Sequence, residues 1–346
     1  MAAVRNARLV FKKYLAEGYP IPGETFATDN SGTIDLDNEA LNGGVLLKTL
    51  SISIDPYLRG RMNATVPEGY YATPFQLGAT LVNWAVAKVL RSEHPDWQQG
   101  DVLTGVLEFA EYQILPKDIP AHVRKLPKDA NIPWSLYVGI AGMPGRTAYY
   151  GWREICDAKK GETIYVSTAA GPVGSLVVQL AKLEGLKVIG SAGSADKVQF
   201  IRDIGADVAF NYKETSIDSV MKEHGPIDIY WDHIGNEALE TVIRHMKVFG
   251  RVAVIGTIAS YNNKPYPISN LDAVLYKSLK LQGMIVGRLG TKYWDDFYNL
   301  VPNLIKEGKI KYTEDIVRSL DDAGHLITAV QKGTNIGKAV IVLADE

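Results

Sequence analysis

Cysteine is nearly absent from this sequence. The 346 residues include a single cysteine, Cys156, so no intramolecular disulfide can form and the disulfide-rich secreted class is excluded. One cysteine supplies neither the four thiolates of a structural zinc site nor the Cys and His ligands of a catalytic one. The six histidines show no pair at i, i+4 spacing, so we expect no metal. Cys156 lies in an apolar helical context, which indicates a buried, inert thiol.

Charge of one sign is not in surplus, and long apolar runs are missing. Lys and Arg number 37 against 39 Asp and Glu, and a formal net charge of -2 gives no electrostatic footprint for nucleic acid. The two uncharged stretches, 69–87 and 163–181, contain polar residues, glycine or proline, so we expect no membrane span. The first fifteen residues mix charged and apolar side chains and do not resemble a secretory signal. A cytoplasmic protein is therefore expected.

The length and composition predict a globular protein of about two domains. The first third is rich in Pro, Gly and Tyr, and its short β-type runs predict a strand-rich, barrel-like domain. These runs are Gly44–Leu50, Val102–Leu107 and Glu111–Ile114. From about Asn131, apolar runs of strand length alternate with helical ones, which is typical of βαβ units on a parallel sheet.

The middle region gives the clearest predictions of individual elements. Thr163–Ser167 is predicted as a buried strand, and Val173–Glu184 as a helix that Gly185 closes. Further predicted strands are Lys187–Gly190, Asp207–Tyr212, Ile227–Trp231, Arg251–Ile255 and Lys338–Leu343, and further predicted helices are Ala195–Ile204, Ser216–His224, Glu237–Lys247 and Tyr293–Lys306.

A turn of small residues joins the first of these strands to its helix. It contains Gly171-Pro172-Val173-Gly174, where the backbone can approach a pyrophosphate and the helix start supplies amide donors. Pro172 suits the first helical turn because its φ is fixed and it has no N–H to leave unpaired. The position at a strand–turn–helix junction favours a dinucleotide site, with a tight structural turn as the alternative.

The tip of the second strand indicates which dinucleotide would bind. An NAD site would have an acid there for the ribose 2′-OH, but residues 187–194 contain none. Ser194, Lys197 and Tyr212 follow, and together they could hold a 2′-phosphate, so NADPH is the expected cofactor. Taken singly, Lys197 is equally consistent with a solvated helix residue and Tyr212 with a strand-end aromatic residue.

Several ordered segments carry a family resemblance. They are Ser53-Ile54-Asp55-Pro56-Tyr57-Leu58-Arg59, Gly142-Met143-Pro144-Gly145-Arg146-Thr147-Ala148-Tyr149, Val166–Gly174, Asn211-Tyr212-Lys213, Ser260-Tyr261-Asn262 and Asn335-Ile336-Gly337-Lys338. With these segments the chain resembles the zinc-independent medium-chain dehydrogenase/reductases, and among them the prostaglandin reductases and alkenal double-bond reductases.

This resemblance implies an α/β fold with a Rossmann-type doubly wound parallel sheet and a GroES-like β-rich catalytic domain. We place the catalytic domain at residues 1–130 and 311–346 and the NADP-binding domain at residues 131–310. The resemblance also implies NADPH, a small enal or enone substrate, and a homodimer joined through the nucleotide domain.

Carried over position by position, the resemblance places residues Gly171–Gly174 under the pyrophosphate and Lys197 and Tyr212 at the 2′-phosphate. The nicotinamide half would lie beside the Ile255–Tyr261 loop, and Tyr57 and Tyr261 would line the substrate cleft. The further cofactor-binding residues it implies are Met143, Thr147, Ser194, His233, Ile255, Gly256, Thr257, Ser260, Met284, Ile285, Val286 and Asn335. Three positions depart from the family pattern: Thr168 replaces the usual Ala, His233 a frequent Asn, and Met284 a frequent Phe.

Without a metal, the expected chemistry depends on positioning and hydrogen bonding. Hydride transfer to the β-carbon of an enal or enone leaves negative charge on the carbonyl oxygen, which needs a donor. Tyr261 is the first catalytic candidate, with the ribose 2′-OH of the cofactor as an alternative donor. Tyr57 is the second catalytic candidate, and we expect it to shape the cleft. Two alternatives stay open: an NADPH quinone oxidoreductase and a non-catalytic NADPH-binding protein.

Overall fold

The computed structural model describes residues 3–127, 131–264 and 266–345. The chain forms two compact units, and unit 1 comprises the residues up to Met143 together with the segment from Glu314 onward. Unit 2 comprises Pro144–Thr313. The first boundary differs from the expected one at residue 130, because the 3-10 helix η1 (Trp134–Val138) packs on strands of unit 1.

Unit 1 is built around a β-sheet that combines distant parts of the chain. In the described residues this sheet has the order β16-β17-β5-β6-β7-β9, and β8 pairs with β5. Its strands are β5 (Val45–Ser53), β6 (Val82–Ser92), β7 (Val102–Glu108), β8 (Tyr112–Leu115), β9 (Arg124–Lys125), β16 (Glu314–Val317) and β17 (Lys338–Val342). Two small sheets pair β1 (Val4–Arg5) with β4 (Thr33–Ile34), and β2 (Arg8–Phe11) with β3 (Phe26–Asp29). Helical segments are α1 (Leu58–Arg61), η5 (Leu320–Asp322) and α9 (Ala323–Lys332).

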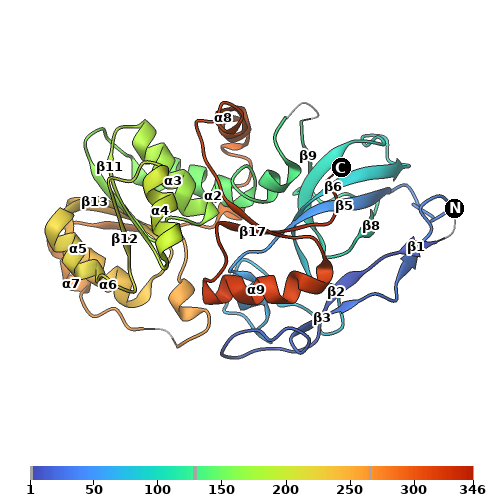
Figure 1. Cartoon of the computed structure of the whole chain (residues 1–346), viewed down its shortest axis with the longest axis horizontal. Coiled ribbons are helices and arrows are strands. Elements are labelled where there is room, and N and C mark those ends of the chain that lie inside the picture. Colours follow the sequence, from blue (N-terminus) through green and yellow to red (C-terminus); the bar gives the residue numbers. More distant parts are fainter. Residues whose placement is uncertain (1–2, 128–130, 265, 346) are drawn as a thin grey trace. The chain divides into compact units, whose positions relative to one another are not determined.

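The hydrophobic core of unit 1 lies between the strands of its sheets and helix α9. β5 has five apolar residues among its nine and is buried except at the half-buried Lys48, as expected of a strand at the centre of a sheet. Leu326, Ile327 and Val330 of α9 add the helical stripe that covers this core. β17 lies directly beside β5 as an antiparallel neighbour, so the end of the chain completes a sheet that begins near residue 45 (Figure 1).

Unit 2 is a parallel sheet with flanking helices. In the described residues its six strands have the order β12-β11-β10-β13-β14-β15, and every pairing is parallel. The strands are β10 (Thr163–Val166), β11 (Lys187–Ala192), β12 (Val208–Asn211), β13 (Ile227–Asp232), β14 (Met246–Val254) and β15 (Lys280–Gly283). This order is that of a doubly wound Rossmann-type sheet, so the expected fold class is confirmed.

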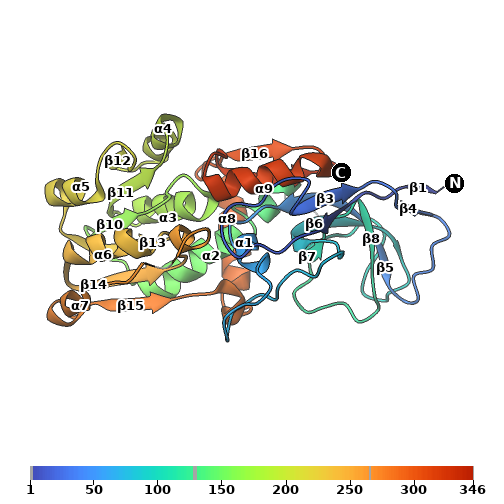
Figure 2. The ribbon, with the colours of Figure 1, turned by 90° about the horizontal axis from the view of Figure 1, so that it is seen from below.

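The helices of unit 2 follow the strands in alternation. They are α2 (Met143–Gly151, which begins at the boundary residue), the π-helical turn η2 (Trp152–Cys156), α3 (Pro172–Leu183), α4 (Ala195–Asp203), α5 (Ile217–His224), α6 (Asn236–Arg244), η3 (Ile258–Ser260), α7 (Leu271–Tyr276), η4 (Val286–Leu289) and α8 (Trp294–Lys306). α5, α6 and α7 lie in a row beside the sheet (Figure 2). On the strands, the rings of Tyr165 and Tyr230 stack 5.1 Å apart in the buried core.

The boundary between α6 and β14 was predicted wrongly, because the strand expected to begin at Arg251 begins at Met246. The helix expected over Glu237–Lys247 ends at Arg244, and Met246 already belongs to β14, where it pairs with Ile227. Met246 is buried in the core, and its apolar side chain fits the helical spacing as well as the strand. A prediction from hydrophobic periodicity alone therefore extended the helix past its end, to a residue that belongs to β14.

Candidate functional site

The reversal of strand order in unit 2 defines where a ligand can bind. The chain runs from β10 outward to β11 and β12, and then returns to place β13 on the other side of β10. In open α/β sheets, ligands bind outside the carboxyl ends of the strands at such a switch point. The residues that follow β10 and β13 are therefore the first to consider, and Ser167 and His233 lie there in direct contact.

The turn after β10 is shaped to admit a phosphate. Gly171 is the N-cap of α3, and Pro172 occupies the first helical turn. A Cβ on Gly174 would lie 2.7 Å from the carbonyl oxygen of Thr168 and 2.8 Å from the Cα of Ala169, so only glycine fits there. Gly174 therefore lets the start of α3 pack directly on the end of β10, and the amide N–H groups of a helix start favour an anion.

The tip of β11 lies beside the end of β12. A Cβ on Gly193 would lie 2.8 Å from Tyr212 Oη and 3.2 Å from Lys213 Cε. Ser194 is the N-cap of α4, and Lys197 follows in the first turn of that helix. Lys213 was missed in the sequence analysis, although it directly follows Tyr212. Lys213 comes close to Gly193 only because β11 and β12 pair side by side, and the sequence alone does not reveal that pairing.

His233 is held on both ring nitrogens at the switch point. Trp231 Nε1 donates to His233 Nε2 over 3.0 Å, and an indole N–H can only donate. His233 Nδ1 lies 2.7 Å from the carbonyl oxygen of Ser167 and 2.8 Å from Thr168 Oγ1. Burial lowers the pKa of His233 to about 4, against the opposing hydrogen bond to Ser167. The neutral ring therefore carries its proton on Nδ1 and uses Nε2 as an acceptor.

The loop after β14 packs against the residues that follow β13. Ile255 N donates to the carbonyl oxygen of Asp232 over 2.8 Å, and Ile258 N donates to that of His233 over 3.0 Å. Met284 N donates to the carbonyl oxygen of Val254, which ties the end of β15 to the end of β14. The expected cofactor-binding residues that unit 2 gathers at the carboxyl ends of its strands are Gly171, Pro172, Val173, Gly174, Ser194, Lys197, Tyr212, His233, Ile255, Gly256, Thr257, Ser260, Tyr261, Met284, Ile285 and Val286.

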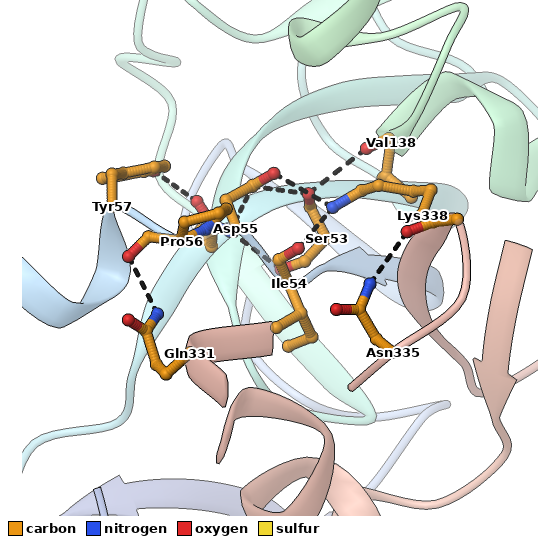
Figure 3. Close-up of polar contacts among 11 residues, drawn as sticks. Ser53, Ile54, Asp55, Pro56, Tyr57, Val138, Gln331, Asn335 and Lys338 are labelled. Atoms are coloured by element: carbon orange, nitrogen blue, oxygen red, sulfur yellow. Dashed lines mark hydrogen bonds and ion pairs between the residues drawn. The ribbon is translucent and has the colours of Figure 1, made fainter. Parts of the chain in front are cut away.

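Other expected residues lie elsewhere in the chain. Thr147 belongs to α2 in unit 2, whereas Met143, Tyr57 and Asn335 belong to unit 1. Asn335 Nδ2 donates to the carbonyl oxygen of Gly337 over 2.8 Å. Within unit 1, Tyr57 and Asn335 flank the same buried polar network (Figure 3).

The centre of this network is a buried ion pair between Lys338 and Asp55. Lys338 Nζ donates to Asp55 Oδ1 over 3.0 Å and also to the carbonyl oxygen of Ile54. Ser53 Oγ donates to Asp55 Oδ2 over 2.5 Å, so both carboxylate oxygens have partners. Burial lowers the pKa of Lys338, and the attraction of Asp55 opposes that shift. The pair joins β17 to the chain just after β5, 283 residues earlier.

Asn83 connects this ion pair to Tyr57. Its Nδ2 donates to Asp55 Oδ2 over 2.9 Å and to the carbonyl oxygen of Ser53 over 2.8 Å. Because both amide protons point to acceptors, Oδ1 faces Tyr57 and accepts from its hydroxyl. Burial raises the pKa of Tyr57 above its usual range. The proton of Tyr57 is therefore directed into the protein.

Comparison with known proteins shows the family. Two family models match: an N-terminal domain of oxidoreductase over residues 33–123, and a zinc-binding dehydrogenase over residues 172–306. The chain is 38% identical to the NADP(+)-dependent 2-alkenal reductase of Nicotiana tabacum over 99% of both chains. It is 41% identical to the (+)-pulegone reductase of Mentha piperita, over 89% of this chain and 90% of the relative. The chain belongs to the medium-chain dehydrogenase/reductases, in their alkenal and prostaglandin reductase branch.

A solved structure of this medium-chain fold is similar over the whole length. CurA of Vibrio vulnificus, solved in complex with NADPH, matches with a TM-score of 0.86 at 28% identity, over 98% of this chain and 99% of CurA. Within the described ranges, the chain has no group of three or more His, Cys, Asp or Glu side chains that could hold a metal ion. In the same part of the chain, no helix combines the length and apolar character needed to cross a membrane.

Two of the three departures from the family pattern touch each other. Thr168 and His233 lie 65 residues apart in sequence and meet through the 2.8 Å contact between Oγ1 and Nδ1. The third, Met284, lies near Trp231, since a Cβ on Gly151 would contact Met284 Cε at 3.3 Å and Trp231 Cη2 at 2.6 Å. The three residues that depart from the family pattern thus lie in one packed region around Trp231 and His233.

The pKa of His233 predicts a pH-dependent contribution to stability. Because its folded pKa lies below the usual 6.5, the neutral ring stabilises the fold above that pH, and this contribution disappears as the pH falls toward about 4. At about 1.4 kcal/mol per pKa unit, the change is on the order of 3 kcal/mol. We expect the difference in unfolding free energy between wild type and His233→Gln, measured by urea denaturation, to shrink by this amount between neutral pH and acid.

The matched control is His325→Gln, which alters an exposed histidine of α9 in unit 1. A pH-dependent change seen for His233→Gln and not for this control would be specific to the switch point. A pH-independent difference for His233→Gln would contradict the assignment of a neutral ring with a lowered pKa.

Proposed function

We propose that this protein is an NADPH-dependent reductase of carbon–carbon double bonds conjugated to an aldehyde or ketone. The observation that carries the proposal is the combination in unit 2 of a phosphate-admitting turn after β10 with a β11 tip flanked by Tyr212 and Lys213. The 2-alkenal and pulegone reductases, which the chain resembles over most of its length, support the reaction class. Unit 2 would then be the cofactor-binding domain and unit 1 the catalytic domain.

NADPH fits the residues present in unit 2. The glycines at 171 and 174 leave the backbone of the turn open to a diphosphate, and the helix start supplies amide donors. Ser194, Lys197, Tyr212 and Lys213 provide hydroxyl and ammonium donors for a 2′-phosphate, and no carboxylate at the β11 tip repels it. When bound, NADPH supplies a hydride for the electron-poor β-carbon of the substrate.

The protein would stabilise the charge that this transfer produces. As the β-carbon gains hydride, negative charge moves to the carbonyl oxygen, and a neutral hydroxyl donor lowers the energy of that state. We assign this role to Tyr261, which follows η3 in the loop after β14. Tyr57 shapes the substrate site, because its own proton is committed to Asn83. The α-carbon then takes a proton from water, which completes the reduction.

Steady-state assays test this function. We expect NADPH to be consumed with enals and enones, and a chelator to leave the rate unchanged. Tyr261→Phe should lower kcat by about 100-fold, as removal of one donor to a developing oxyanion does. Tyr57→Phe is the matched control, and it should lower kcat far less because it removes a proton that points to Asn83. Turnover with quinones alone would contradict the proposal, and so would turnover only after zinc is added.

The two lysines near the β11 tip generate a second test. Lys197→Ala and Lys213→Ala should each raise the Kd for NADPH by about 10-fold and leave the Kd for NADH nearly unchanged, because only NADPH carries the 2′-phosphate. Isothermal titration measures both constants. Lys187→Ala is the control, since Lys187 lies at the opposite end of the same strand. Equal losses for NADPH and NADH would contradict this placement of the 2′-phosphate.

We further propose a cytoplasmic homodimer joined through unit 2. β15 is the last strand of the parallel sheet, and in the described residues its outer edge has no partner strand. Large apolar side chains lie exposed next to this edge: Phe249 at 73%, Leu275 at 75% and Tyr276 at 76%. Phe249 N donates to the carbonyl oxygen of Lys277, which brings these residues into one patch. A second copy would cover both the edge and the patch.

Light scattering coupled to size-exclusion chromatography tests the dimer. The wild type should elute as a dimer. The double variant Phe249→Glu with Tyr276→Glu should elute as a monomer, because dimerisation would bury unpaired carboxylates of both copies in the interface. Leu183→Glu, at another exposed apolar position at the end of α3, should leave the dimer intact. A monomeric wild type at all concentrations would contradict the proposal.

A further inference from the structure

The proton on His233 determines the direction of the Thr168 hydroxyl. His233 Nε2 accepts from Trp231, so the single proton of the neutral ring is on Nδ1. A protonated ring nitrogen has no lone pair with which to accept a hydrogen bond. Thr168 Oγ1, at 2.8 Å from Nδ1, must therefore accept in this contact, sharing the N–H with the carbonyl oxygen of Ser167.

This leaves the hydroxyl proton of Thr168 available for another acceptor. In the part of the chain that the structure describes, His233 Nδ1 is the sole hydrogen-bond partner of Thr168 Oγ1. The side chain is partly exposed, whereas its neighbours Ser167 and Ala169 are buried. A hydroxyl donor therefore remains at this partly exposed residue, the first of the turn that we assign to the diphosphate.

The backbone of Thr168 keeps this donor at the turn. Its φ of 48° is in the left-handed region, which a β-branched residue rarely adopts. The carbonyl oxygen of Thr168 accepts from Gly171 N over 3.1 Å, and it also approaches Gly174 too closely for any side chain there. Thr168 is thus anchored to the glycines at the start of α3 by its backbone and to His233 by its side chain.

We propose that Thr168 is a phosphate-binding residue of this reductase, with its Oγ–H donating to the diphosphate of NADPH, and that His233 is the positioning residue that turns this proton outward. The inference rests on the proposed use of NADPH. It also changes the role expected for His233: both ring nitrogens are engaged within the protein, so His233 acts through Thr168 and has no ring nitrogen left for the cofactor.

Cofactor binding in the absence of substrate tests this role. We expect Thr168→Val, which keeps the β-branched shape and loses the hydroxyl, to raise the Kd for NADPH by about 5- to 10-fold in a fluorescence titration. Thr168→Ser, which keeps the hydroxyl, should bind within about twofold of wild type. Adenosine 2′-monophosphate has the 2′-phosphate but no diphosphate, so its Kd should not change in Thr168→Val.

His233→Ala separates positioning from a general structural effect. Without the Nδ1 donor, the hydroxyl of Thr168 is no longer directed outward, and Thr168→Val should add less than about twofold to the Kd in that background. If His233→Ala does not fold, the comparison of Val with Ser at position 168 still decides the proposal.

The outcomes that overturn the proposal are distinct from a failure of the proposed function. A Thr168→Val protein that binds NADPH as well as wild type overturns the role of Thr168. Equal losses for NADPH and adenosine 2′-monophosphate overturn it too, because they would report a distorted unit. A wild-type protein that binds no NADPH overturns the cofactor assignment itself.

Discussion

The placement of β13 on the opposite side of β10 from β11 is the constraint on which the nucleotide half of this protein depends. It makes the carboxyl edge between β10 and β13 the switch point of the sheet, where open α/β sheets bind their ligands. The unit 2 residues proposed to bind the cofactor, other than Thr147 of α2, follow strands at this edge. The hydrogen bonds between Ser167, Thr168 and His233 join the segments that follow β10 and β13.

In unit 1, a buried polar network holds the hydroxyl group of Tyr57 in a defined orientation. A buried lysine and a buried aspartate would each be costly alone, and together they satisfy one another and orient Asn83. The orientation of the amide then fixes the proton of Tyr57. The proton of Tyr57 is thus fixed by a chain of contacts that leads through Asn83 and Asp55 to Lys338.

Much of unit 2 could be predicted from the sequence because its signals are local. The helix start at Gly171-Pro172 and the apolar spacing up to Leu183 define α3 within one residue, and the same applies to α4. β11 begins at the predicted residue and extends two residues further, to Ala192. The limits of α6 could not be predicted, since Met246 is apolar at a spacing that a helix and a strand both allow. Lys213 was missed because its proximity to Gly193 arises only when β11 and β12 pair.

The candidate site was less predictable where its contacts join distant segments. Thr168 and His233 are 65 residues apart in the sequence, and Asp55 and Lys338 are 283 apart. Periodicity and turn signals are local, so they predict neither contact. The resemblance to a family suggested where the cofactor lies, but it gave each residue a role by position. The hydrogen-bond geometry is what distinguishes a side chain that faces a ligand from one that supports its neighbour.

The split of unit 1 between two chain segments has a consequence for biosynthesis. All of unit 2 is translated before β17, so unit 2 leaves the ribosome ahead of the strand that completes the sheet of unit 1 beside β5. Until Lys338 emerges, Asp55 lacks the ammonium group that pairs with it. The two units therefore become complete at different stages of synthesis.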